Sequence, residues 1–168
     1  MEKGFTFIET AVADLTIQEA MSEAIQEAKI AFNEDEMPVG AVILQNGELL
    51  ASAHNQREAL CDPTAHAEVL AIRKAAKKLG KRRLDDAVIV VTLEPCPMCA
   101  GAILAAEMNR VIYGARDSVK GCAGSLYALT EDRELGEIPS TGGMREEECQ
   151  RIISDFFLRT RREKKNSV

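Results

Sequence analysis

Apolar residues recur at helical spacing near the start of the chain and then gather in short β-branched runs. Between residues 17 and 31 they stand three or four positions apart, which predicts a helix that runs to about Phe32. Thr16-Ile17-Gln18-Glu19 has the hydroxyl and the carboxylate of a capping box, so we expect this helix to begin at Thr16. Residues 1–14 carry no clear period and are expected to form a loose arm.

The elements after this helix alternate between strands and helices. Residues 39–45 and 48–54 flank Asn46-Gly47, a dipeptide typical of a two-residue hairpin turn. The rest of the pattern predicts a helix over 64–79 that ends at Gly80, a buried strand over 87–92, a helix over 97–107, a strand over 110–114, loops with a short helix or strand over 117–143, and a final amphipathic helix over 145–162. This alternation predicts helices layered on a mixed sheet.

Length and composition narrow the class of protein. A chain of 168 residues that is 46% hydrophobic is expected to fold as a single domain, 1–168. The longest nearly apolar run, 98–106, has about half of the roughly twenty residues that a membrane helix needs, and the N-terminus lacks the basic start of a signal peptide. The five cysteines, an odd number without a secretory signal, indicate metal binding or buried thiols in a cytoplasmic protein.

Charge is unevenly distributed along the chain. The net charge is −6, but residues 159–165 hold five basic side chains and one acid, which leaves the remainder with 16 basic and 26 acidic residues. The chain is therefore an acidic body with a basic end, including the tail over 163–168. These cations could bind the phosphates of an RNA, although a solvated helix end is the simpler interpretation; they are Arg159, Arg161, Arg162, Lys164 and Lys165.

Two short segments carry the candidate chemistry. His66-Ala67-Glu68 and Pro95-Cys96-Pro97-Met98-Cys99 each stand at the start of a predicted helix. Cys96 and Cys99 share one helix face, and with His66 they make a Cys₂His set that leaves the fourth position of a zinc ion open to water, as in catalytic zinc sites. In the first turn of its helix, Glu68 can reach that water and carry its proton to a ring nitrogen or a departing amine.

The single residue types allow other interpretations. A lone C-x-x-C also occurs in redox proteins and in four-cysteine structural sites, but the second C-x-x-C of a structural ribbon is absent, and His66 and Glu68 have no task in a redox motif. Buried thiols are the simpler interpretation for Cys61, Cys122 and Cys149. We expect His54 to be a packed side chain and not a fourth ligand.

With both segments in place, the chain resembles the bacterial tRNA-specific adenosine deaminases of the cytidine deaminase superfamily. The resemblance extends from about Thr16 to Arg162, and its motifs are Glu36-Met37-Pro38-Val39-Gly40-Ala41-Val42, Asp62-Pro63-Thr64-Ala65-His66-Ala67-Glu68, Thr92 to Ala102, Gly114-Ala115-Arg116-Asp117, Gly124-Ser125-Leu126 and Ser154-Asp155-Phe156-Phe157. It implies a three-layer α/β/α sandwich with a mixed five-stranded sheet.

The same resemblance implies an activity and its partners. These are hydrolytic deamination of adenosine to inosine at the wobble position of a tRNA anticodon, one zinc ion per subunit on His66, Cys96 and Cys99, proton transfer by Glu68, and a homodimer that binds the anticodon stem-loop and not DNA. Further site residues are implied residue by residue: Asn55 contacts the flipped nucleoside, Val39 and Ala41 form the pocket wall, Asp117 holds flanking nucleotides, and Phe156 borders the RNA.

Two other functions remain open at this point. A guanine or cytosine deaminase, acting on a free base or nucleoside, would share all of the zinc chemistry, although it would have no need of the Gly114–Asp117 block or of the basic end. A non-catalytic, zinc-stabilised binding subunit would need the three ligands, but it would have no use for Glu68.

Overall fold

The computed structural model describes the main chain of residues 6–166 and the side chains of residues 16–166. The elements are, in order, α1 (Thr6–Asn33), β1 (Gly40–Gln45), β2 (Glu48–His54), α2 (Ala67–Leu79), β3 (Ala87–Leu93), α3 (Pro97–Ala105), β4 (Arg110–Ala115), a short 3₁₀ helix η1 (Leu129–Glu131), β5 (Ser140–Thr141) and α4 (Glu146–Asn166). Between residues 6 and 166, no helix is both long enough and apolar enough to cross a bilayer.

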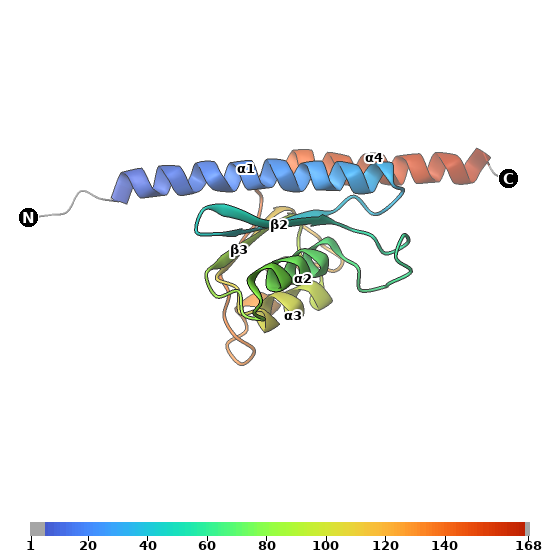
Figure 1. The fold of residues 1–168 in the computed structure, drawn as a ribbon. Coiled ribbons are helices and arrows are strands. Elements are labelled where there is room, and N and C mark those ends of the chain that lie inside the picture. The colour runs from blue at the N-terminus through green and yellow to red at the C-terminus, as the bar shows by residue number, and fades with distance from the viewer. Residues whose placement is uncertain (1–5, 167–168) are drawn as a thin grey trace, which may run out of the picture.

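The five strands form one mixed sheet in the order β2-β1-β3-β4-β5. β1 pairs antiparallel with β2 and with β3, whereas β3, β4 and β5 run parallel to one another. Helices α1 and α4 lie side by side on one face of the sheet, and α2 and α3 cover the other (Figure 1). The predicted three-layer α/β/α sandwich with a mixed five-stranded sheet is confirmed.

Alternation along the central strands divides the core into two halves. Val42 and Val90 pack with Met21 and Ile25 of α1, while Ile43 lies in the cluster on the other face, which holds Ile89, Val91, Ile103 and the alanines of α2. Each half is closed by small residues on the helices, so the helices approach the sheet closely. The predicted hairpin is confirmed as well, since Asn46 and Gly47 have φ values of 52° and 77°, as a turn between tightly paired strands requires.

Both ends of the fold differ from the expectation. Helix α1 begins at Thr6, so a start at Thr16 and a loose arm over 6–14 are wrong; residues 1–5 lie outside the described residues. A capping box does not stop a helix when the residues before it can continue the helix, and residues 6–15 contain neither proline nor glycine, the two types that break helices most strongly. Helix α4 continues to Asn166, because Glu, Lys and Arg favour helix and its last-turn lysines complement the helix dipole.

Gly40 sits where β1 meets α1. A Cβ at this position would collide with the main-chain oxygen of Ala24 and with the main-chain nitrogen of Ala28, and neither can move without displacing the helix. We therefore expect Gly40→Ala to lower the stability by about 1–3 kcal/mol, measured by thermal or urea unfolding. Gly101→Ala is the matched control, because a Cβ at Gly101 has no neighbour within 4 Å in the described chain; equal stability of the two variants would contradict this packing.

Candidate active site

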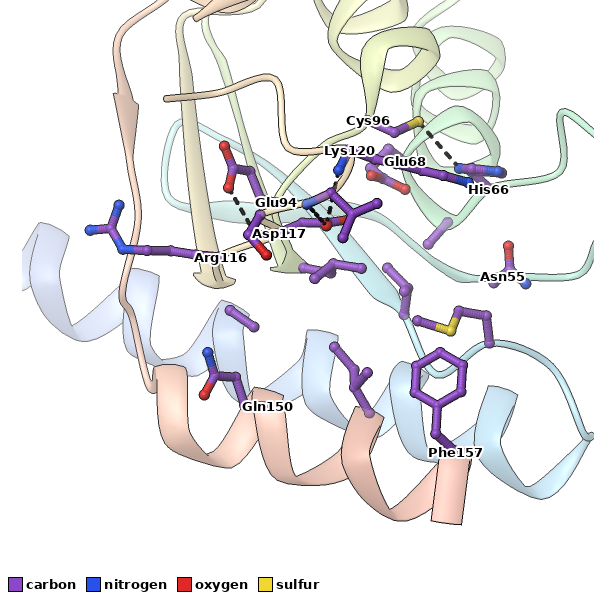
Figure 2. A pocket seen from close by; sticks show the side chains of 18 of the residues that line it. Asn55, His66, Glu68, Glu94, Cys96, Arg116, Asp117, Lys120, Gln150 and Phe157 are labelled. Atoms are coloured by element: carbon purple, nitrogen blue, oxygen red, sulfur yellow. Dashed lines mark hydrogen bonds between the residues drawn. The ribbon is translucent and has the colours of Figure 1, made fainter. Parts of the chain in front are cut away.

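The described chain encloses a pocket of about 570 Å³ between the ends of the strands and helix α4. Figure 2 shows Asn55 and His66 on one side of it, Arg116 and Asp117 on the other, and Gln150 and Phe157 of α4 along its edge. Three loops, the N-terminus of α2 and one helix face thus contribute to a single cavity. The pocket is where residues from distant parts of the sequence meet.

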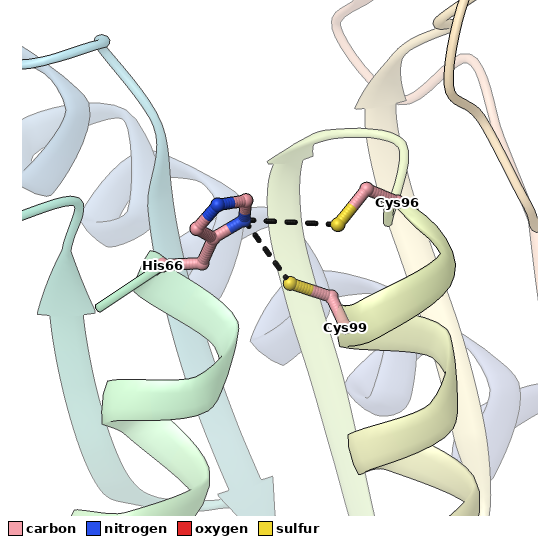
Figure 3. A group of neighbouring side chains, drawn as sticks. All are labelled: His66, Cys96 and Cys99. Atoms are coloured by element: carbon pink, nitrogen blue, oxygen red, sulfur yellow. Dashed lines mark hydrogen bonds between the residues drawn. The ribbon is translucent and has the colours of Figure 1, made fainter. Parts of the chain in front are cut away.

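The three predicted metal ligands lie together beside this pocket. His66 Nδ1 is 3.7 Å from Cys96 Sγ and 3.4 Å from Cys99 Sγ (Figure 3). Donors bound to one tetrahedral zinc ion at ordinary bond lengths stand roughly 3.5 Å apart, so the separations fit zinc. Among residues 16–166, these three are the one group of His, Cys, Asp and Glu side chains whose ligand atoms converge closely enough to hold a metal. The donor set itself, one imidazole and two thiols, is the set that zinc prefers.

Cys96 and Cys99 influence each other's pKa. The hydrogen bond from Cys99 lowers the pKa of Cys96 to about 4, whereas the same bond and burial raise the pKa of Cys99. The pKa of His66 is raised by its hydrogen bond to Cys96. A divalent cation that displaced the protons from the ligand atoms of Cys96, Cys99 and His66 would leave two thiolates and a neutral imidazole. This is the ligand form that zinc binds.

Glu68 follows the ligand His66 by two residues and interacts electrostatically with His66 and Cys99. His66 caps helix α2 with extended φ and ψ angles of −73° and 151°, and Glu68 follows in the first turn with 4% of its surface exposed. Its helix begins at Ala67, three residues later than predicted, and this start allows both side chains to point into the pocket. Burial raises the pKa of Glu68 to about 7, so its carboxyl group can both accept and return a proton near neutral pH.

Asn55 lines the pocket as expected, and a second buried acid holds it there. The amide nitrogen of Asn55 donates to Glu36 Oε2 at 2.9 Å, and Glu36 Oε1 accepts from the main-chain nitrogen of Ala59 at 2.8 Å. Glu36 has 1% of its surface exposed. In the sequence, Glu36 stands out only as the first residue of the motif 36–42. Its buried position is set by the turn after α1, which no local sequence pattern indicates.

The expected wall residues divide between pocket and core. Val39 lines the pocket, but Ala41 is fully buried in the core cluster beside Ala53 and Val91, so the expectation for Ala41 is wrong. Both face the same side of the sheet, and Ala41 lies two residues further from the pocket, under the helices. Asp117 does line the pocket, and its Oδ1 also accepts from the main-chain nitrogens of Val119 and Lys120, which closes a tight turn.

The aromatic at the edge of the pocket is Phe157 and not Phe156. Phe156 packs edge-on against Phe32 of α1 with ring centroids 5.9 Å apart, while Phe157 lines the cavity. Successive helix residues point about 100° apart, so the register of α4 decides which of the two faces the site. Phe157 and not Phe156 thus lines the pocket, and the contact of Phe156 with RNA stays a prediction.

Arg159 belongs to the packing of the two long helices. Its guanidinium donates to the main-chain oxygen of Phe32 at 2.8 Å and to Asp35 at 2.7 Å, and it lies 4.2 Å from the centroid of the Phe32 ring. It thereby closes the C-terminus of α1 and is not available to an RNA phosphate as expected. The basic side chains at 161, 162, 164 and 165 remain exposed.

The other cations separate into two groups. Arg57, Arg116 and Lys120 line the pocket, where the sequence had not singled them out as a group. Arg82 and Arg83 of the basic loop pair instead with Asp85 and Glu107. Three cations therefore line the cavity, together with the acids Glu68, Glu94 and Asp117.

The comparisons with known proteins agree with this geometry. Residues 15–115 match the cytidine and deoxycytidylate deaminase zinc-binding region. The chain is 47% identical over 146 residues to the tRNA-specific adenosine deaminase of Bacillus subtilis (strain 168), a match that covers 86% of this chain and 91% of that protein. This chain belongs to the tRNA-specific adenosine deaminase family.

Solved structures share the fold of this deaminase. One, from a study of A-to-I editing by tRNA:A34 deaminases at the wobble position of transfer RNA, has a TM-score of 0.77 and 39% identity, and the match covers 80% of this chain and 98% of that one. A guanine deaminase from Bacillus subtilis has a TM-score of 0.56 and 43% identity, covering 58% of this chain and 63% of that one. The tRNA enzyme thus matches a larger share of this deaminase.

The ligand group makes a direct prediction about zinc. We expect Cys96→Ser and Cys99→Ser each to lower zinc content well below one ion per chain, because two donors do not hold the ion at a tetrahedral site. Metal analysis of the purified variants measures this. Cys61→Ser is the matched control, since Cys61 is exposed and outside the group; full zinc in a Cys96 or Cys99 variant would rule out this site.

Proposed function

We propose that this protein is a zinc-dependent hydrolase that converts adenosine to inosine at the wobble position of a tRNA anticodon. One observation carries the proposal: the buried carboxyl of Glu68 faces the same pocket as His66 and Cys96, with Cys99 completing the ligand group. Membership in the tRNA-specific adenosine deaminase family supports the choice of substrate. The proposed reaction replaces the exocyclic C6–N bond of adenine with a C6–O bond, consuming water and releasing ammonia.

The residues have distinct tasks in this reaction. His66 Nδ1 and the sulfurs of Cys96 and Cys99 hold one zinc ion per subunit, which supplies the Lewis acidity that activates water at neutral pH. Glu68 accepts a proton from the attacking water and delivers it to a ring nitrogen of the base. It then carries the second proton of that water to the exocyclic amine, which departs as ammonia. Its raised pKa of about 7 suits both transfers, because a group that titrates near the working pH is populated in both forms.

The pocket walls suggest how the nucleotide is held. Asn55, fixed by Glu36, presents a polar edge to the base or ribose, and Val39 offers an apolar surface beside it. Phe157, which lines the pocket, is the aromatic side chain proposed to lie next to the RNA. Asp117 stands opposite, on the loop proposed to receive the flanking nucleotides.

The cations in the pocket lining favour RNA over a free base, although Glu68, Glu94 and Asp117 line the pocket as well. Arg57, Arg116 and Lys120 all line the cavity, and together they can meet several phosphates of a strand that enters it. A guanine or cytosine base carries no phosphate and has no need of three cations. The non-catalytic binding subunit is disfavoured by Glu68, because burying a carboxyl group is costly unless the group has a task.

We also propose that the protein is a cytoplasmic homodimer. Large apolar side chains of the loops are exposed, with 72% of Val119, 66% of Tyr127 and 53% of Leu60 accessible, and Val119 also lines the pocket. A second copy that covered this surface would bury them beside the cavity. Sedimentation of the zinc-loaded protein tests the association state, and a monomer at micromolar concentration would contradict it.

Glu68→Ala tests the catalytic proposal. We expect turnover of an adenosine-containing anticodon stem-loop to fall by about 10² to 10⁴, the usual contribution of a general acid–base group, with zinc content and thermal stability retained. Glu68→Gln is the matched control for volume, and it should be equally slow. Activity within a few-fold of the unmodified protein in either variant would refute the proton transfer assigned to Glu68.

The exposed end of α4 makes a separate prediction about tRNA binding. Replacing Arg161, Arg162, Lys164 and Lys165 with serine should weaken tRNA binding and flatten its dependence on salt, because fewer counterions are released from phosphates. The matched control replaces Lys81, Arg82 and Arg83, two of which already pair with acids. If both variants bind tRNA alike over a salt titration, the end of α4 has no part in binding.

A further inference from the structure

Glu94 is a buried acid at the end of β3, next to the segment that carries Cys96 and Cys99. Only 2% of its surface is exposed, and its carboxylate accepts three main-chain hydrogen bonds. Oε2 accepts from the nitrogen of Asp117 at 3.0 Å, and Oε1 accepts from those of Ala123 at 3.0 Å and Ser125 at 2.9 Å. The three donors lie between 23 and 31 residues further along the chain.

These bonds wrap the segment 117–125 around one carboxylate. At Gly121 a Cβ would collide with the Glu94 carboxylate and with the main-chain oxygen of Asp117, so only glycine fits there. The nitrogen of Cys122 donates to the oxygen of Pro95 at 2.8 Å, which fastens the middle of the segment to the ligand-bearing turn. Residues 117–125 belong to no helix or strand. Their main-chain hydrogen bonds to the Glu94 carboxylate define the shape of the loop instead.

The wrapped loop presents its outer side to the pocket. Asp117, Val119 and Lys120 all line the cavity, and Figure 2 shows Glu94 next to Asp117 and Lys120. Because Oδ1 of Asp117 in turn accepts from the nitrogens of Val119 and Lys120, the bond from the Asp117 nitrogen to Glu94 orients the whole turn. Buried bonds to a charged acceptor are stronger than neutral ones, so this orientation is held firmly.

We propose that Glu94 is a positioning residue that pre-shapes loop 117–125 to receive the nucleotides flanking the target adenosine. This rests on the proposed function, since it assigns the loop to RNA. Glu94 acts through main-chain hydrogen bonds and needs no change of its own protonation. A glutamine in place of Glu94 would have nearly the same size, so it would leave no cavity. Its amide NH₂ would face at least one main-chain N–H, however, and the loop would lose the hydrogen bond made by that N–H.

Glu94→Gln in the zinc-loaded protein tests this role, with Glu131→Gln, an exposed acid in the 3₁₀ helix, as the matched control. We expect KM for the anticodon stem-loop to rise about tenfold, as the loss of one hydrogen bond to a charged group would predict, with kcat within about threefold. Amide hydrogen exchange at Asp117, Ala123 and Ser125 should speed up in Glu94→Gln and stay unchanged in the control.

A double variant separates positioning from general destabilisation. If Glu94 acts through the loop, Glu94→Gln should raise KM much less in an Asp117→Ala background than in the unmodified protein. Additive effects, or a Glu94→Gln protein with unchanged KM and unchanged exchange, would overturn the proposal.

Gly121→Ala keeps the test decisive if Glu94→Gln fails to fold, because its Cβ pushes the loop away from an intact carboxylate. It should raise KM in the same way, and an unchanged KM would again overturn the proposal. If the unmodified protein does not deaminate the stem-loop, the proposed function fails. Hydrogen exchange then still decides whether Glu94 shapes the loop.

Discussion

The site depends on two helix N-termini that meet on one face of a sheet. α2 and α3 pack against the same side of the central strands, so the residue before α2 and the first turn of α3 arrive beside each other. His66 comes from one helix start and Cys96 and Cys99 from the other, with sulfur-to-nitrogen distances of 3.7 and 3.4 Å. Helix N-termini favour negative charge, which suits the thiolates of a zinc site.

Three buried glutamates divide the work around these ligands. Glu36 and Glu94 accept hydrogen bonds from segments that form opposite walls of the pocket, and both are thereby satisfied in the interior. Glu68 lies beside the metal ligands, and burial raises its pKa to about 7. A carboxylate with strong donors serves as a fixed support, whereas one whose ionised form is disfavoured can exchange protons. The environment of each acid, and not its type, sets its task.

Local patterns predicted the elements and the chemistry, but the packing decided the remaining residues. The hairpin, the buried strand and the zinc-ligand spacing depend on neighbours a few residues apart, so they are visible in the sequence. Whether Phe156 or Phe157 faces the pocket depends on the register of α4, and Ala41 is covered by helix α2. Glu36, Glu94 and Arg159 bind partners between 19 and 127 residues away, and no short-range signal marks such pairs.

The most direct test of the central claim is a comparison of substrates with the zinc-loaded protein. Mass spectrometry can follow inosine formation in an anticodon stem-loop with adenosine at the wobble position, inosine formation from free adenosine, xanthine formation from guanine and uracil formation from cytosine. The pocket with its three cations, the buried Glu68 and the zinc ligands together predict inosine in the stem-loop alone. Turnover of a free base with no reaction in the stem-loop would contradict the account, because it would leave the zinc chemistry without the RNA substrate.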